Sequence, residues 1–134
     1  MATLHLFRNA PEVIAVTAGK YIFRKGEAAK VMYLIIEGEV DLMLDETVVE
    51  TAREGSFIGE MALIDEEPRS ASARARIDCR VFPIYEARFQ SLVKETPFFA
   101  LQVMKTLAQR LRRMDARLGA KPKGKKKKLI PAGC

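Results

Sequence analysis

The sequence predicts a mainly β domain, an antiparallel sandwich or small barrel, with helices at both ends. Three observations support this prediction. Short runs rich in β-branched and aromatic residues recur every eight to twelve residues or so up to Tyr85. Glycines and acidic residues in turn-like settings separate these runs. From Glu86 onwards the apolar residues follow helical spacing, so strands and long helices occupy different parts of the chain.

The elements follow one another along the chain. Strands are predicted at 13–18, 21–23, 31–37, 40–44, 47–51, 70–76 and 80–85. Helices are predicted at 2–9, 87–94 and 97–118. Thr96 can cap the last helix, Pro97 suits its first turn, and Gly119 suits its end.

The last helix carries an apolar stripe with alternating steps of four and three residues. Two interpretations fit it: the helix packs on its own domain, or two copies pair along the stripe into a homodimer through 97–118. The stripe consists of Ala100, Met104, Leu107, Leu111, Met114 and Leu118. The charged positions, predicted to face outward, are Lys105, Arg110, Arg112, Arg113, Asp115 and Arg117.

The composition is that of a soluble globular protein. The chain has 134 residues, 49% of them hydrophobic and 30% charged, which is enough for one domain with a real core. No apolar run approaches the ~20 residues of a membrane span, and the N-terminus lacks the features of a secretory signal. The two cysteines, Cys79 and Cys134, lie far apart, which predicts a reduced, cytoplasmic protein.

The net charge of +6 comes from the C-terminal tail. Residues 120–134 carry six lysines and no acidic residue, and the rest of the chain is formally neutral. We therefore expect a folded domain at 1–119 and a disordered lysine-rich tail at 120–134. The tail could only add solubility, or it could touch an anionic surface such as a nucleic acid or a membrane.

The sequence contains few residues that could carry out catalysis or bind a metal ion. His5 is the single histidine, which argues against a histidine-rich metal site and against a catalytic triad. Cys79 lies in a strand-like run and is predicted to be buried as a small apolar residue. The acidic group Asp65, Glu66 and Glu67 is predicted to be a solvated loop.

The segment 55–75, GSFIGEMALIDEEPRSASARA, does suit a ligand. Gly59 permits a tight turn and close approach of the backbone, and the helix formers after it offer N–H groups to a phosphate. The planar fork of Arg69 can hold two phosphate oxygens, and Ser70 can add a hydroxyl. Glu60 would repel a phosphate but could accept a hydrogen bond from a neighbouring sugar hydroxyl. The alternative is a surface helix with an ordinary Glu–Arg pair.

This segment resembles the phosphate-binding cassette of cyclic-nucleotide-binding domains, and the similarity extends over 12–118. Within that family it is most similar to the bacterial, catabolite-activator-like branch. The resemblance implies an eight-stranded jelly-roll β-roll with an N-terminal helix and two C-terminal helices. The matching cassette residues are Phe57, Gly59, Glu60, Ala62, Leu63, Pro68, Arg69, Ser70, Ala71, Ala73 and Ala75.

The resemblance also implies roles for individual residues. Glu60 would accept the ribose 2′-hydroxyl, Arg69 would pair with the exocyclic phosphate oxygens, and Ser70 would bind the phosphate. Ligand contacts are also implied for Gly59, Met61, Ala62 and Ala71, and for Val49 at the base. Met114 and Asp115 stand where the family's bacterial branch places a Thr-Ser pair over adenine, so the base lid must differ.

The function implied is a cyclic-nucleotide sensor, not an enzyme and without a metal. cAMP is the expected ligand, with cGMP possible, and binding would move the C-terminal helix against an effector protein in trans. Only about fifteen residues follow that helix, so sequence-specific DNA binding through a helix-turn-helix domain is not expected. The alternatives are a scaffold β-roll that has lost its ligand and a binder of anionic surfaces that acts through its tail.

Overall fold

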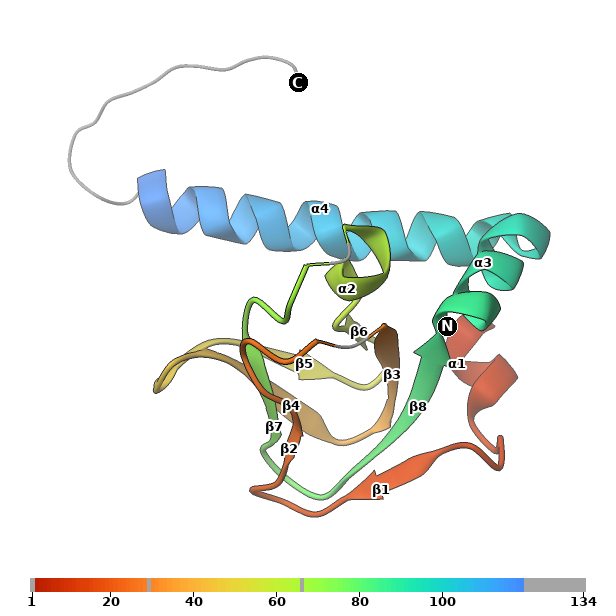
Figure 1. The fold of residues 1–134 in the computed structure, drawn as a ribbon, viewed down its shortest axis with the longest axis horizontal. Coiled ribbons are helices and arrows are strands. Elements are labelled where there is room, and N and C mark those ends of the chain that lie inside the picture. Colours follow the sequence, from red (N-terminus) through yellow and green to blue (C-terminus); the bar gives the residue numbers. More distant parts are fainter. Residues whose placement is uncertain (1, 29, 66, 120–134) are drawn as a thin grey trace.

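The computed structural model describes residues 2–28, 30–65 and 67–119 and places side chains at all of these except Ala2, Thr3, His5 and 114–119. The predicted tail at 120–134 lies outside the described residues. The elements, labelled in Figure 1, are α1 (Ala2–Phe7), β1 (Ile14–Val16), β2 (Tyr21–Phe23), β3 (Val31–Glu37), β4 (Glu39–Leu44), β5 (Thr47–Arg53), β6 (Phe57–Ile58), α2 (Met61–Ile64), β7 (Ser72–Ala75), β8 (Cys79–Tyr85), α3 (Glu86–Glu95) and α4 (Pro97–Gly119).

The eight strands form two four-stranded sheets, in the orders β1-β8-β3-β6 and β2-β7-β4-β5. Every pairing is antiparallel; Met32 lies opposite Ile84 in one sheet, and Val40 opposite Ala75 in the other. Strands adjacent in the sheets are mostly distant in sequence, as a rolled sheet requires. The predicted mainly β jelly-roll with flanking helices is confirmed.

Successive side chains of β3 point to opposite faces of its sheet, and a hydrophobic core lies on each face. One core lies between this sheet and the helices, and the other lies between the two sheets. The helix-side core contains Met32, Leu34, Ile36, Phe57, Phe82, Ile84, Phe99 and Val103. The inter-sheet core contains Phe23, Ile35, Val40, Ala52, Ile58, Ala73, Ala75, Cys79 and Val81.

The chain passes from β3 in one sheet to β4 in the other at Gly38, next to Cys79. Gly38 has φ +103°, and a Cβ there would lie 2.7 Å from both the Cys79 Sγ and the Asp78 carbonyl oxygen, so no larger residue fits. Cys79 is buried, donates its S–H to backbone carbonyls, and has a pKa raised by burial. The prediction that Cys79 is buried is confirmed.

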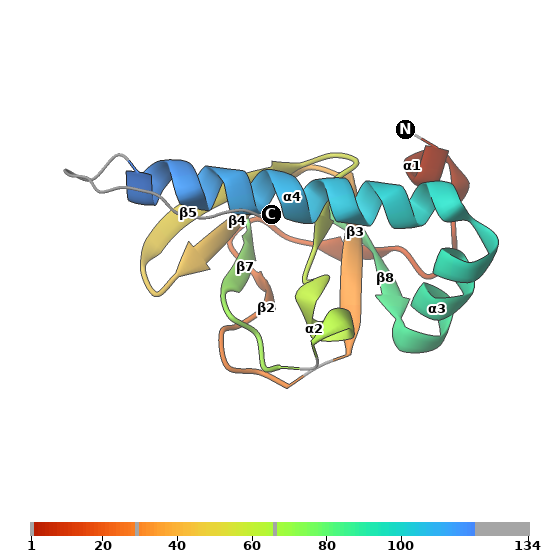
Figure 2. The ribbon, with the colours of Figure 1, turned by 90° about the horizontal axis from the view of Figure 1, so that it is seen from above.

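Helix α4 lies across the roll, from α3 at one end towards β4 and β5 at the other (Figure 2). Its packed face begins with Phe99 and Val103, which are buried in the helix-side core. Met104 and Leu111, which the sequence placed in one stripe with Leu107, are more than half exposed, whereas Leu107 packs against the core. The helix therefore has two apolar faces, one covered by its own domain and one open to solvent.

Candidate functional site

The cassette connects the two sheets at one end of the roll. β6 ends at Ile58, and Gly59 turns the chain with φ +75° into the single-turn helix α2. Ala62 and Leu63 are buried and hold α2 down against the roll. With only four residues, α2 has a small dipole, so the guanidinium of Arg69 is the larger source of positive charge.

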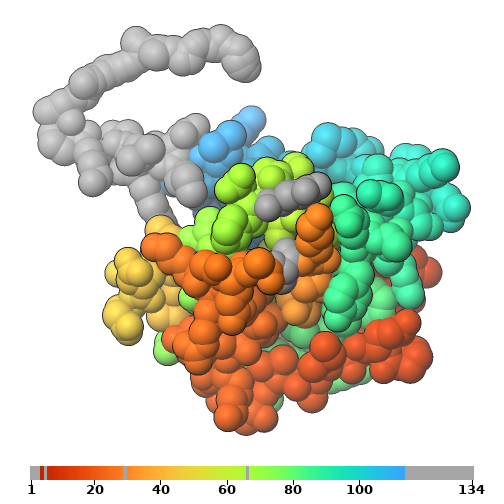
Figure 3. Space-filling view, viewed as in Figure 1, coloured from red at the N-terminus to blue at the C-terminus, as the bar shows by residue number. Residues whose placement is uncertain are grey.

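The Arg69 backbone is tied to the turn that follows β2. The Arg69 N–H donates to the Glu27 carbonyl at 2.9 Å, and the Arg69 carbonyl accepts from the Gly26 N–H at 2.8 Å. In Figure 3 the segment after Gly59 and the segment around Gly26 form adjoining parts of the surface beside α4. Two segments more than forty residues apart in sequence therefore fix where the Arg69 side chain begins.

The Arg69 side chain points into the roll and is 5% exposed. Nη1 donates to the Gly59 carbonyl at 3.1 Å, and Nη2 donates to the Val31 carbonyl at 2.7 Å. A Cβ on Gly59 would lie 2.6 Å from Nη1, so the glycine is required for this approach. The Cζ atom lies 4.1 Å from the centroid of the Phe23 ring.

The partners that the structure shows for the Arg69 guanidinium are uncharged. Among the described residues no carboxylate forms an ion pair with it, and its partners are two carbonyls and an aromatic face. Burial lowers the pKa of the guanidinium below its ordinary value, while Tyr33, Glu27 and Glu60 act in the opposite direction. A buried cation without a carboxylate partner is electrostatically suited to an incoming anion.

The charge of Glu60, by contrast, is paired with a cation. Glu60 is 3% exposed, and its Oε2 accepts a hydrogen bond of 2.6 Å from Arg110 Nη1, on α4. Arg110 Nε lies 3.2 Å from both carboxylate oxygens of Glu50 on β5, and Nη2 donates to the Phe57 carbonyl at 2.7 Å. Burial alone would lower the Arg110 pKa, but Glu60 and Glu50 outweigh it and raise the value.

The predicted outward position of Arg110 is therefore wrong. Arg110 lies eleven residues after Phe99 and seven after Val103, so it continues their packed face towards the roll. The sequence contains this spacing, but the prediction followed the apolar stripe, which placed Arg110 on the outer face. Arg110 is the main site residue that the sequence prediction missed, and Glu50 is the second.

Three buried side-chain atoms of the described residues have no hydrogen-bond partner: Glu60 Oε1, Arg69 Nε and Gln102 Oε1. Buried polar atoms are nearly always paired, so each exception calls for an explanation. Two of the three belong to the acceptor and the donor that the sequence assigned to a ribose and a phosphate. The residues present therefore fit such a ligand, with one acceptor and one donor left to be filled.

The other predicted site residues vary in their exposure. Ala62 is buried, Val49 and Ala71 are half-buried, and Met61 and Ser70 are exposed. Their ligand contacts stay predictions. Met114 and Asp115 lie on α4, but their side chains are outside the described ones, so the base lid also stays a prediction.

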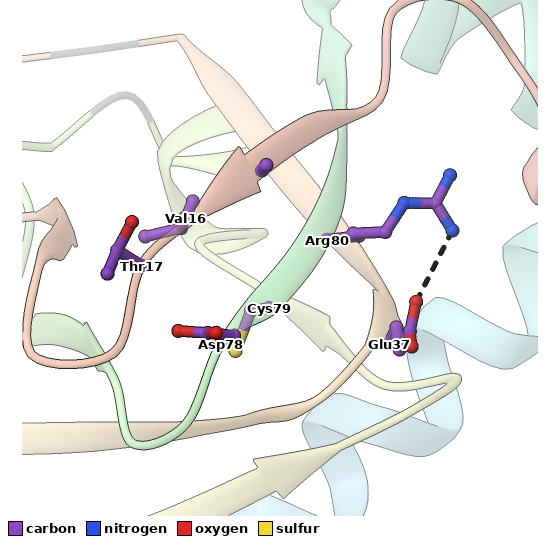
Figure 4. A pocket seen from close by; sticks show the side chains of 7 residues that line it. Val16, Thr17, Glu37, Asp78, Cys79 and Arg80 are labelled. Atoms are coloured by element: carbon purple, nitrogen blue, oxygen red, sulfur yellow. Dashed lines mark hydrogen bonds and ion pairs between the residues drawn. The ribbon is translucent and has the colours of Figure 1, made fainter.

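A cavity of about 250 Å³ lies elsewhere, between β1 and the start of β8. Figure 4 shows its lining, in which Arg80 pairs with Glu37 at 3.4 Å. Asp78, also in the lining, accepts a hydrogen bond from the Ala18 N–H. The volume is below the usual range of small-molecule sites, and none of the cassette residues lines it. We therefore assign the candidate site to the cassette and not to this cavity.

The described residues contain no group of three or more His, Cys, Asp or Glu side chains that could hold a metal ion. Of the helices in that part of the chain, none is long and apolar enough to cross a bilayer.

The known proteins that this chain resembles share one kind of domain. The family model of the cyclic nucleotide-binding domain matches residues 13–96. The chain is 39% identical over 95 residues to a cyclic nucleotide-gated potassium channel of Rhizobium etli, covering 71% of this chain and 26% of the channel. It is 33% identical over 105 residues to the cyclic AMP receptor protein of Thermus thermophilus, covering 75% of this chain and 49% of that protein.

A solved structure, the catabolite activator protein of Thermus thermophilus, matches with a TM-score of 0.72 and 30% identity, over 87% of this chain and 57% of that one. The chain spans less than two-thirds of the length of each of these relatives. The matched residues 13–96 make up more than half of the chain and run from just before β1 to the end of α3. On these grounds the chain belongs to the cyclic nucleotide-binding domain family.

Proposed function

We propose that this domain is a sensor that reversibly binds a cyclic nucleotide, with cAMP preferred over cGMP, and that it is not an enzyme. The observation that carries the proposal is the pair of unfilled groups on Arg69 and Glu60. A cyclic nucleotide supplies the complement of both, because its phosphate is an anion and its ribose 2′-hydroxyl is a hydrogen-bond donor. The preference for cAMP is supported by Ser70 after the cassette arginine and by the named ligand of the Thermus thermophilus relative.

Arg69 and Glu60 have enough free hydrogen-bonding groups for the phosphate and the ribose of the ligand. A guanidinium has five N–H donors, and Arg69 uses two of them on the Gly59 and Val31 carbonyls. The other three, including the free Nε–H, can meet phosphate oxygens in the charge-assisted geometry that favours arginine. Glu60 Oε1 can accept the ribose hydroxyl while Oε2 keeps Arg110.

The proposed signal passes through α4. Arg110 links this helix to the ribose acceptor Glu60, to β5 through Glu50 and to β6 through the Phe57 carbonyl. A ligand hydroxyl on Glu60 changes the charge that Arg110 meets, and movement of α2 and Arg69 towards the phosphate changes the packing below α4. Ligand binding would thereby change how often α4 occupies each of its positions. An effector protein on a separate chain would respond to that position.

Titration calorimetry of the whole chain with cAMP, cGMP and 5′-AMP tests the proposal. We expect saturable heat with cAMP, weaker binding of cGMP, and little binding of 5′-AMP, because its phosphate is not held in a ring with the ribose. Absence of heat with both cyclic nucleotides at millimolar ligand would refute the sensor and favour a scaffold β-roll.

We also propose that α4 pairs with a second copy of the chain. The support is its second apolar face, where Phe98, Leu101, Met104 and Leu111 are each more than half exposed on one helix. Sedimentation velocity should show a dimer for the wild type and a monomer for Leu111→Glu, which places a charge in the pairing face. The matched control is Arg112→Glu at the neighbouring exposed position; equal profiles for all three proteins would contradict the pairing.

We place the sensor in the cytoplasm, in keeping with the buried and unpaired thiol of Cys79. The lysine-rich tail at 120–134 stays a predicted separate region, which adds solubility or contacts an anionic surface and does not replace nucleotide binding.

A further inference from the structure

Phe23, on β2, contacts the cassette arginine from a different part of the chain. Its side chain is buried, and the Arg69 Cζ lies 4.1 Å from its ring centroid. The Tyr33 ring lies behind it at 6.2 Å between centroids and an angle of 23°. A Cβ on Gly59 would come within 3.1 Å of the Phe23 ring, so the turn, the ring and the guanidinium are in mutual contact.

The chemistry of this contact differs from that of an ion pair. An aromatic face attracts a guanidinium through its quadrupole, and the attraction grows when the pair is removed from water. The ring occupies the flat face of the cation and uses none of its N–H donors, which project from the edge. A carboxylate in the same place would pair with those donors and compete with a phosphate for them.

We propose that Phe23 is a positioning residue of the phosphate site, which holds the Arg69 guanidinium in the orientation that binds the anion while leaving its free donors and its charge available. This inference rests on the proposed function and concerns the same site. The two backbone carbonyls fix the rotation of the guanidinium in its plane, and the ring fixes the plane itself. Tyr33 in turn keeps the ring in place.

The test compares Phe23→Met, which fills similar space without a ring, with Phe23→Tyr, which keeps the ring. We expect Phe23→Met to weaken cAMP binding by about 3- to 30-fold in calorimetry, the range of a desolvated cation–π contact. Phe23→Tyr should stay within about twofold of the wild type. In an Arg69→Lys background, where no planar fork remains to stack, the effect of Phe23→Met should fall below twofold, since the two changes act through one contact.

Tyr21→Met is the matched control. Tyr21 also lies on β2 and carries an arginine on its ring, with the Arg24 Cζ at 3.8 Å, but that arginine lies outside the cassette. Its affinity for cAMP should equal that of the wild type. If Phe23→Met does not fold, Phe23→Leu serves in the same comparison.

The outcomes separate this inference from the proposed function. If the wild type binds neither cyclic nucleotide, the proposed function fails and takes the inference with it. If the wild type binds cAMP and a folded Phe23→Met binds equally well, only the role of Phe23 is overturned. An equal loss with Arg69 and with Lys at position 69 would show that Phe23 acts only through packing, which also overturns the proposal.

Discussion

Replacement of Arg69 by alanine is expected to weaken cAMP binding by about 2–5 kcal/mol, or roughly thirtyfold to several thousandfold. The guanidinium is buried and carries no carboxylate partner among the described residues, so the ligand phosphate would be its main counter-charge. Its removal leaves that phosphate without its counter-charge. Calorimetry of Arg69→Ala against the wild type measures the loss directly.

Two variants make this result specific. Arg69→Lys retains a positive charge without the bidentate fork and should lie between the wild type and Arg69→Ala. Arg74→Ala removes a cation at the end of the same segment, on β7, whose Cζ lies 6.0 Å from the Tyr21 ring centroid, and should leave affinity unchanged. A change of less than threefold for a folded Arg69→Ala would show that Arg69 does not grip the phosphate.

Loss of Arg110 is expected to destabilise the domain by about 3–5 kcal/mol, because Arg110→Met leaves the Glu60 carboxylate buried without its cation. Glu50 would lose its two hydrogen bonds from Arg110 at the same time, and the Phe57 carbonyl would lose its donor. The free energy of unfolding, measured in urea by circular dichroism, should fall by this amount while the slope of the transition stays constant.

A second substitution and a matched arginine identify the cause. Glu60→Leu in the Arg110→Met background removes the unpaired charge and should restore most of the lost stability. Arg113→Met, one turn after Arg110 on α4, removes an exposed partner of Glu50 and should change stability by less than about 1 kcal/mol. If Arg110→Met and Arg113→Met proved equally mild, the Arg110–Glu60 pair would not be what fastens α4 to the roll.

Most of the fold could be predicted because its signals are local. Runs rich in β-branched and aromatic residues gave β2 and β3 at their observed bounds, and the change of periodicity at Glu86 located the start of α3. β6 was not predicted as a separate strand, because a two-residue run shows no periodicity and exists only through its pairing with β3. The split of α4 into two apolar faces also depends on which residues the rest of the domain covers.

Within the candidate site, Gly59, Glu60 and Arg69 could be predicted because they lie in one continuous segment with recognisable chemistry. Phe23 and Glu50 could not, since they come from β2 and β5 and reach Arg69 and Arg110 only in the folded chain. Each of them has an ordinary role in its own local pattern, as a strand residue or a surface charge. Their contribution depends on burial and on a partner remote in sequence.

The two cores lie on opposite faces of one sheet and contact different parts of the proposed signalling path. The cassette arginine lies against Phe23, whose neighbours are the inter-sheet residues around Ala73, whereas α4 rests on the helix-side core through Phe99 and Val103. The sheet containing β3 and β8 stands between the two sets. A change in the position of α4 thus alters apolar contacts on one side of that sheet, while the polar link from α4 to the other sheet runs through Arg110 and Glu50 on β5.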